Sequence, residues 1–265
     1  MDDACNNFGP LFKSRLDLIL NQSTYSKAFY CAHQIIKPVL QVGPTCGFAA
    51  LSNALNTYNL NSPSLNDLVE LGRSDGITNN GELFSVDWLC NFIQKYWTNL
   101  NPKIAKFSEM DLTSIIEYFG KKRENEIPTI LIPYDCDRGN FEPCNRNGVG
   151  AHWAILTGFL LLCDYNDGAE PSDLCSIKMV NSSTEFNDFS RGLKGDENCL
   201  YLIAYQGKSC HPAIWSFQTL LQSNAQLNMP AEGQNNNKNN NFCLPPEGMA
   251  MALKGKCLLL GGGSE

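Results

Sequence analysis

One cysteine of the chain stands where a thiol could act as a nucleophile. Cys46 follows a Gly-Pro turn in the stretch QVGPTCGFAALSNAL and precedes apolar residues at helical spacing. Thr45 is a suitable N-cap, so Cys46 is expected in the first turn of a helix. The unpaired amide groups and the positive end of the helix dipole at such a position favour a thiolate. Cys46 is therefore the candidate nucleophile.

Two neighbours of Cys46 suit the same chemistry. Gln41 lies five residues upstream, where its side-chain amide could donate to an oxyanion. Gly47 has no side chain, which would let a substrate backbone approach the sulfur closely. Gln41 is therefore a candidate catalytic residue and Gly47 a candidate substrate-binding residue.

A nucleophilic thiol usually works with an imidazole, and the chain has three histidines. His152 stands out because GVGAHW leads from a loop of small residues directly into an apolar run. A cysteine at a helix start, followed about a hundred residues later by a histidine at a strand start, is typical of cysteine peptidases. His152 is therefore the candidate base, while His33 and His211 lie in less informative segments.

The elements that must position these residues change character along the chain. Residues 45–120 show apolar positions at helical spacing, with serine N-caps at Ser64 and Ser85. Residues 127–260 contain short apolar runs rich in β-formers, which predict a β-rich part. The pattern predicts an α+β fold in which a helical lobe carries the nucleophile and a β-rich lobe carries the histidine.

The same pattern suggests a domain organisation. Residues 1–34 are expected to form an N-terminal extension, and residues 35–265 a single peptidase domain. The run GQNNNKNNN at residues 233–241 has no apolar side chain that it could bury, so it is expected to be a mobile loop.

Composition excludes several other classes of protein. The 265 residues carry 20 Lys and Arg against 27 Asp and Glu, a net charge of −7, which argues against a nucleic-acid binder. No apolar run reaches the roughly 18 residues of a membrane span, and the N-terminus lacks the features of a signal peptide. We therefore expect a cytoplasmic protein without a membrane partner.

The cysteine pattern does not predict a metal site. Twelve cysteines are present, but no CxxC motif occurs and only three histidines could join a ligand set. Reduced thiols that act as small apolar residues are the expected state. Neither a metal nor another cofactor is expected.

Three stretches of the sequence resemble a known family. QVGPTCGFAALSNAL, GAHWAILTGFLL and YQGKSCHPAIWSFQTLLQSNAQL resemble the actin maturation proteases, papain-like cysteine peptidases related to the bacteriocin-processing peptidases. The resemblance covers roughly residues 35–260, and its third stretch is the most specific. The first stretch alone would indicate only a papain-like hydrolase.

The resemblance implies both an activity and a partner. It implies a papain-like fold and removal of an N-acetylated Met or Cys from the N-terminus of immature actin. By motif, Gln41 becomes the oxyanion donor, Cys46 the nucleophile and His152 the general base and acid. Some members carry a proline-rich N-terminal extension suited to profilin, whereas residues 1–40 here contain only Pro10 and Pro38, so profilin binding stays open.

The third catalytic residue has two candidates. Asn181 ends the run SIKMVN after His152, and a short amide at a strand end orients an imidazole well. Gln206 ends the next run and is the alternative, with substrate binding as its other possible role. Trp153 and Lys208 are further candidate substrate-binding residues, because Lys208 could meet the acidic residues that follow the scissile bond. A solvated loop lysine is the alternative for Lys208.

Two other functions use the same residues. A papain-like hydrolase of different specificity, such as a deubiquitinase or a general peptidase, would also need Cys46 and His152. A non-catalytic actin-binding module would not. The joint presence of Gln41, Cys46 and His152 favours an enzyme.

Overall fold

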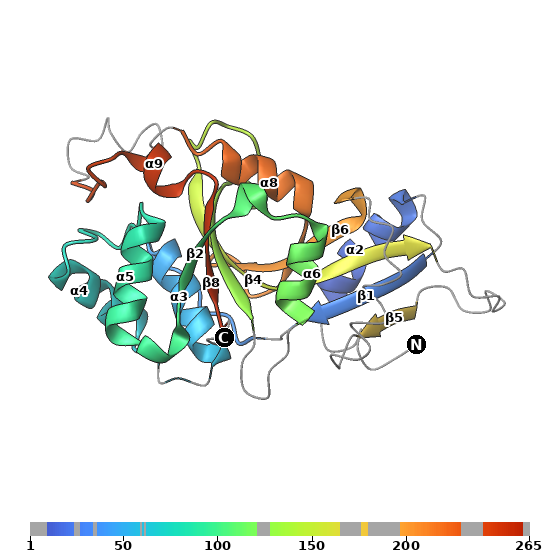
Figure 1. Cartoon of the computed structure of the whole chain (residues 1–265), viewed down its shortest axis with the longest axis horizontal. Helices are drawn as coiled ribbons and strands as arrows, with labels where there is room; N and C mark the ends of the chain where they lie inside the picture. The colour runs from blue at the N-terminus through green and yellow to red at the C-terminus, as the bar shows by residue number, and fades with distance from the viewer. Residues whose placement is uncertain are drawn as a thin grey trace.

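The structure is a computed structural model, and it describes residues 10–23, 27–33, 36–58, 60, 62–120, 128–164, 176–179, 197–228 and 241–261. Helices cover both faces of one eight-stranded sheet in this part of the chain (Figure 1). The α+β class predicted from the sequence is thereby confirmed, as is the helical start of the peptidase region.

The strands are β1 (Lys27–His33), β2 (Lys103–Lys106), β3 (Thr129–Asp135), β4 (Ala151–Asp164), β5 (Ser176–Met179), β6 (Leu200–Gln206), β7 (Ala213–Ser216) and β8 (Lys256–Leu260). Their order is β2-β8-β3-β4-β1-β5, and β6 joins β4 to β7. All pairs are antiparallel except β1 with β5.

Strand β4 is the centre of the sheet because it pairs with three neighbours. β3 pairs with its first half and β1 with its second half, whereas β6 pairs along its opposite edge. The register with β6 shifts between Leu156 and Gly158. The long apolar run of β4 is explained by this position, since a strand covered on both faces has no polar side to present.

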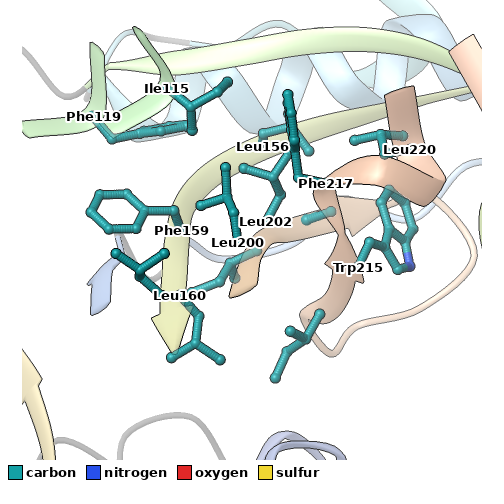
Figure 2. Close-up of a cluster of buried hydrophobic side chains, with 14 of the residues drawn as sticks. Ile115, Phe119, Leu156, Phe159, Leu160, Leu200, Leu202, Trp215, Phe217 and Leu220 are labelled. Atoms are coloured by element: carbon teal, nitrogen blue, oxygen red, sulfur yellow. The ribbon is translucent and has the colours of Figure 1, made fainter. Parts of the chain in front are cut away.

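Successive side chains of the sheet enter two different cores, as the period of a strand requires. Leu156 of β4 packs with residues of one cluster, while Trp153 and Ile155 pack in the other. Figure 2 shows the first cluster, in which residues from β4 and β6 meet side chains from helices on the same face.

The helices are α2 (Pro10–Gln22), α3 (Cys46–Thr57), α4 (Leu65–Ser74), α5 (Val86–Tyr96), α6 (Leu112–Gly120), α8 (Phe217–Ala225) and α9 (Met249–Leu253), with short 3-10 turns at Thr98–Leu100, Phe107–Glu109 and Glu197–Cys199. Helices α2, α6 and α8 contribute to the first core, and α3, α4, α5 and α9 to the second. Ser64 and Ser85 cap α4 and α5 through their side chains, as predicted. Among the described residues, none of the helices has the length and apolar character needed to cross a membrane.

The segment expected as an N-terminal extension is packed into the fold where it is described. Phe12, Leu16, Ile19 and Leu20 of α2 are buried in the first core, and β1 pairs with β4 over seven residues. Helix α2 therefore shares the first core with the sheet, and β1 belongs to the sheet itself. Of the Asn-rich run 233–241, only Asn241 is described.

Candidate active site

Cys46 is the first residue of α3, and the preceding turn sets its position. Gly43 has φ +66°, a left-handed conformation that glycine adopts at little cost, and Pro44 follows it. Thr45 precedes the helix as predicted, but its hydroxyl bonds back to the carbonyl of Val42 at 2.9 Å instead of capping the helix. The helix amides near Cys46 are therefore left without a side-chain cap, and the thiol is half-buried.

Gly47 lets the start of α3 pack tightly. A Cβ at this position would lie 2.9 Å from Cβ and Cδ2 of Leu83 and 3.4 Å from Cδ1 of Trp153. The Trp153 indole donates to the carbonyl of Leu83 at 2.8 Å, which fixes this contact. Packing alone thus accounts for a glycine beside Cys46, without the substrate contact that the sequence suggested.

His152 is the second residue of β4, and only 6% of it is exposed. Its ring lies 5.7 Å from the Tyr134 ring at 82° and 5.5 Å from the Phe141 ring at 39°. Its Nε2 atom is buried and has no hydrogen-bond partner in the part of the chain that the structure describes. Two aromatic rings therefore hold this imidazole.

A buried carboxylate holds the loop that leads into His152. Asp135 accepts from the backbone N–H of Arg146 at 2.6 Å, of Gly150 at 2.8 Å and of Gly148 at 3.0 Å. A Cβ on Gly150 would lie 2.3 Å from the Cys136 carbonyl oxygen, so only glycine fits there. Three bonds to one side chain thus fix this loop to the end of β3.

Helix α8 supports the same region with polar side chains at its end. The Ser223 hydroxyl donates to the Asp135 carbonyl at 2.7 Å, and Asn224 donates to the Pro133 carbonyl at 2.8 Å. Gln226 donates to the Cys144 carbonyl and to Asn145 Oδ1, both at 2.8 Å. These contacts give the residues SNAQ of the third sequence stretch a structural task, because they hold β3 and the loop before His152.

Gln41 is fixed between two loops. Its backbone N–H donates to the Gly207 carbonyl at 2.8 Å, and its Nε2 donates to the Gly43 carbonyl at 2.8 Å. A Cβ on Gly207 would lie 2.9 Å from Gln41 Oε1, so the glycine of QGKS leaves room for this side chain. Nε2 has a second N–H, which no hydrogen bond within the described part of the chain uses.

These residues meet at one cavity of about 220 Å³. Five of the residues predicted from the sequence line it, namely Gln41, Cys46, His152, Trp153 and Lys208. Much of the remaining lining is apolar, from Pro44, Leu83, Phe84, Pro133, Phe141, Ala151 and Leu253, with Glu82 added. Residues from both parts of the chain thus share a single cleft.

Burial acts on the two reactive groups in opposite directions. It raises the pKa of the Cys46 thiol, although the N–H groups of Trp153 and Gly47 and the charge of Lys208 act to lower it. It lowers the pKa of His152 to about 4, and Lys208 adds to that shift. The two shifts favour a neutral thiol beside a neutral imidazole, in contrast to the thiolate expected from the helix dipole alone.

The other predicted site residues lie elsewhere. Gln206 is buried at the end of β6, opposite Ala154, and its Oε1 accepts from the Lys208 N–H at 2.8 Å. Asn181 lies outside the described residues. Among the residues that the structure does describe, no group of three or more His, Cys, Asp or Glu side chains could hold a metal ion.

Three features of the site were not found from the sequence. Glu82 is 2% exposed and accepts from the N–H groups of Asn79, Asn80 and Cys243, so it ties the cleft wall to the C-terminal segment. Asp135 and Phe141 also have no motif around them. A buried strand ending in Asp before a loop rich in Gly and Asn was the available signal for Asp135.

Comparison with known proteins shows which family this chain resembles. The family described as "Actin maturation protease-like, C-terminal domain" matches residues 36–160. An actin maturation protease of Danio rerio is 30% identical over 249 residues, which cover 90% of this chain and 77% of that protein. Those of Drosophila melanogaster and Homo sapiens are 29% and 27% identical, over 90% and 98% of this chain and 73% and 75% of their own lengths.

Proposed function

Since the chain belongs to the actin maturation protease family, we propose that it is a cysteine peptidase that removes the N-acetylated Met or Cys from immature actin. The observation that carries this proposal is the cavity shared by Cys46, His152 and Gln41. A thiol, an imidazole and an amide donor around one small cleft are the parts that acyl transfer requires.

The mechanism proposed for these residues starts from the neutral pair. His152 takes the proton of the Cys46 thiol as the sulfur attacks the carbonyl carbon of the first substrate residue. Gln41 donates to the oxyanion that forms, and the protonated His152 then gives its proton to the leaving amine of mature actin. Water, activated by His152, hydrolyses the remaining thioester and frees Cys46.

We propose that the third catalytic residue is Gln206 or Asn181. Gln206 ends β6 opposite Ala154, close in register to His152. Separate Gln206→Ala and Asn181→Ala variants compare the two candidates, and the larger loss of kcat identifies the orienting residue.

The cleft suits a small, uncharged first residue. Its volume of about 220 Å³ is below that of typical ligand pockets, and most of the residues that line it are apolar. An acetylated N-terminus carries no charge into this space, whereas a free ammonium would lose its hydration. Lys208 is exposed at the cleft and available to acidic residues after the scissile bond. Actin is the proposed partner and the cytoplasm the proposed compartment, while profilin binding stays open.

Mass spectrometry of the actin N-terminus tests the proposal. Immature, acetylated actin is incubated with the wild-type protein or with Cys46→Ala, whose fold should be intact because alanine is small and favours a helix. We expect loss of one acetylated residue only with the wild type. Cleavage by Cys46→Ala would contradict the cysteine mechanism. Cleavage of unrelated peptides but not of actin would indicate a general papain-like peptidase.

A further inference from the structure

One residue of the cleft has a backbone conformation that its side chain disfavours. Phe141 has φ +58°, in the left-handed region. The other non-glycine residues with positive φ in the described part of the chain are Asn101 and Asn147, and asparagine tolerates this region. A bulky residue held there is an outlier, and such outliers cluster at functional sites.

Several contacts hold Phe141 in this conformation. The Tyr134 hydroxyl donates to the Phe141 carbonyl at 2.7 Å, and burial raises the pKa of Tyr134 so that it stays a donor. Asp137 closes the turn on either side of Phe141, because its carboxylate accepts from the N–H of Asn140 at 2.9 Å and of Glu142 at 3.2 Å. The conformation is thus built into the loop between β3 and β4.

The conformation places the Phe141 ring at the centre of the site. The ring lines the cleft, lies 5.5 Å from the His152 ring, and has the Lys208 ammonium 5.8 Å from its centroid. The last distance is within the range of a cation–π contact. The ring therefore lies against both the imidazole and the Lys208 ammonium.

We infer that Phe141 is a positioning residue, whose ring clamps the His152 imidazole against Tyr134 and keeps the Lys208 ammonium beside the catalytic pair. His152 has no hydrogen-bond partner at Nε2 among the described residues, so aromatic packing is what restrains its ring there. The role in catalysis rests on the proposed peptidase function, whereas the clamp itself does not.

The ionisation of His152 reports on the clamp without any assay of activity. The ionisable groups that face His152 or share its cleft are Cys46 from α3, Glu82 from the cleft wall, Tyr134 from β3 and Lys208 after β6. Burial is the main cause of the low pKa of His152, and Lys208 is the second. Removing the Phe141 ring exposes the imidazole and frees the lysine, so both changes raise that pKa.

The test compares three variants with the wild-type protein. Phe141→Leu removes the ring and keeps an apolar side chain, Phe141→Tyr keeps the ring, and Phe141→Gly removes the ring and relieves the backbone. NMR titration of the histidine ring protons, with His152→Gln for assignment, gives the pKa of His152. Cleavage of an acetylated actin peptide gives kcat and KM.

We expect the His152 pKa to rise from about 4 towards 6.5 in Phe141→Leu and Phe141→Gly and to stay low in Phe141→Tyr. The acid limb of kcat should move up with it, and kcat should fall by about 10- to 100-fold, the effect of a displaced catalytic group. Phe141→Gly should lose activity without a lower Tm than Phe141→Leu, because glycine suits the left-handed backbone.

An unchanged His152 pKa in Phe141→Leu would overturn the inference, as would losses of kcat that only follow losses of Tm. If the wild-type protein cleaves no actin peptide, the proposed function fails, but the NMR titration still decides whether the clamp exists.

Discussion

Burial gives both Cys46 and His152 a pKa unlike that of a free side chain. The raised pKa of the Cys46 thiol and the pKa of about 4 at His152 predict a neutral resting pair. The alkylation rate of Cys46 by iodoacetamide should therefore rise steadily with pH to above 9, because only the thiolate reacts. Mass spectrometry of the alkylated peptides measures this rate, and the exposed Cys210 serves as the internal comparison.

The helix start favours a thiolate at Cys46, whereas burial raises the pKa of its thiol and favours the neutral form. Cys210 should be alkylated faster near neutral pH. An alkylation rate of Cys46 that stays constant from pH 5 upwards would contradict the neutral pair. It would indicate a thiolate paired with an imidazolium.

The low pKa of His152 also predicts how stability depends on pH. The unfolded chain binds a proton at this residue below about pH 6.5, whereas the folded protein does so only below about pH 4. The contribution of His152 to the free energy of unfolding is therefore fully present above pH 6.5. It falls by about 3 kcal/mol as the pH drops to 4.

Urea unfolding at pH 7 and pH 4.5 measures this effect, with His152→Gln as the comparison. Both proteins share the carboxylates that respond to acid, so the difference between them isolates His152. The wild-type protein should lose about 2 kcal/mol more than His152→Gln over this interval. Equal losses would mean that folding does not lower the pKa of His152.

At the scale of elements, the end of α8 and the loop before β4 act as one support for His152. Gln226→Leu removes the bonds to Cys144 and Asn145 and also the acceptor for the Asn147 N–H. Asn145 and Asn147 are exposed and can bond to water, but the Cys144 carbonyl is half-buried, so its lost bond should cost about 1 kcal/mol of stability. The loop leads into His152, so kcat should fall more than KM changes. Steady-state kinetics and urea unfolding measure both effects.

Gln222→Leu is the matched control for this prediction. Gln222 lies one turn earlier on the same helix, is exposed, and makes one long contact of 3.4 Å with Asn145. It should change kcat and stability little. Equal effects of the two substitutions on kcat and stability would contradict the prediction, because they would not come from the bonds that Gln226 makes to the loop.

Elements with a strong local pattern could be predicted, and those that depend on distant pairing could not. The helical spacing after Cys46 and the long apolar run after His152 are local signals, and both gave correct elements. β1 is seven residues long and pairs with residues more than 120 positions away, a partnership that no local pattern encodes. The Thr45 hydroxyl was predicted as a helix cap, but it donates to the nearby Val42 carbonyl instead. Asp135 escaped prediction because its donors lie in a loop with no periodicity.

At the scale of the whole molecule, the cleft draws its lining from segments across the chain. Residues near 41–46, 82–84, 133–153, 208 and 253 contribute, and they belong to elements on both faces of the sheet. The molecule as a whole carries a net charge of −7, which repels an acidic N-terminus at long range. Recognition of such a substrate must then depend on a local positive charge, and Lys208 is the lysine that lines the cleft.

The net negative charge repels an acidic substrate at long range, whereas Lys208 attracts it locally. The effect of salt on cleavage should therefore change sign when Lys208 is replaced. We consider the ratio of kcat/KM for two acetylated peptides, one with Asp and one with Asn after the first residue. In the wild-type protein Lys208 should keep this ratio above one at low salt, and added salt should reduce it, because exposed charge pairs are screened. In Lys208→Gln only the repulsion by the molecule remains, so the ratio should start below one and rise towards one as salt screens that repulsion. Peptide cleavage followed by mass spectrometry at low and high salt gives both ratios.

Lys103→Gln, on an exposed strand position outside the cleft, is the control and should behave as the wild type. If Lys208→Gln keeps a ratio above one that falls with salt, another positive charge recognises the acidic residues and Lys208 is a solvated lysine.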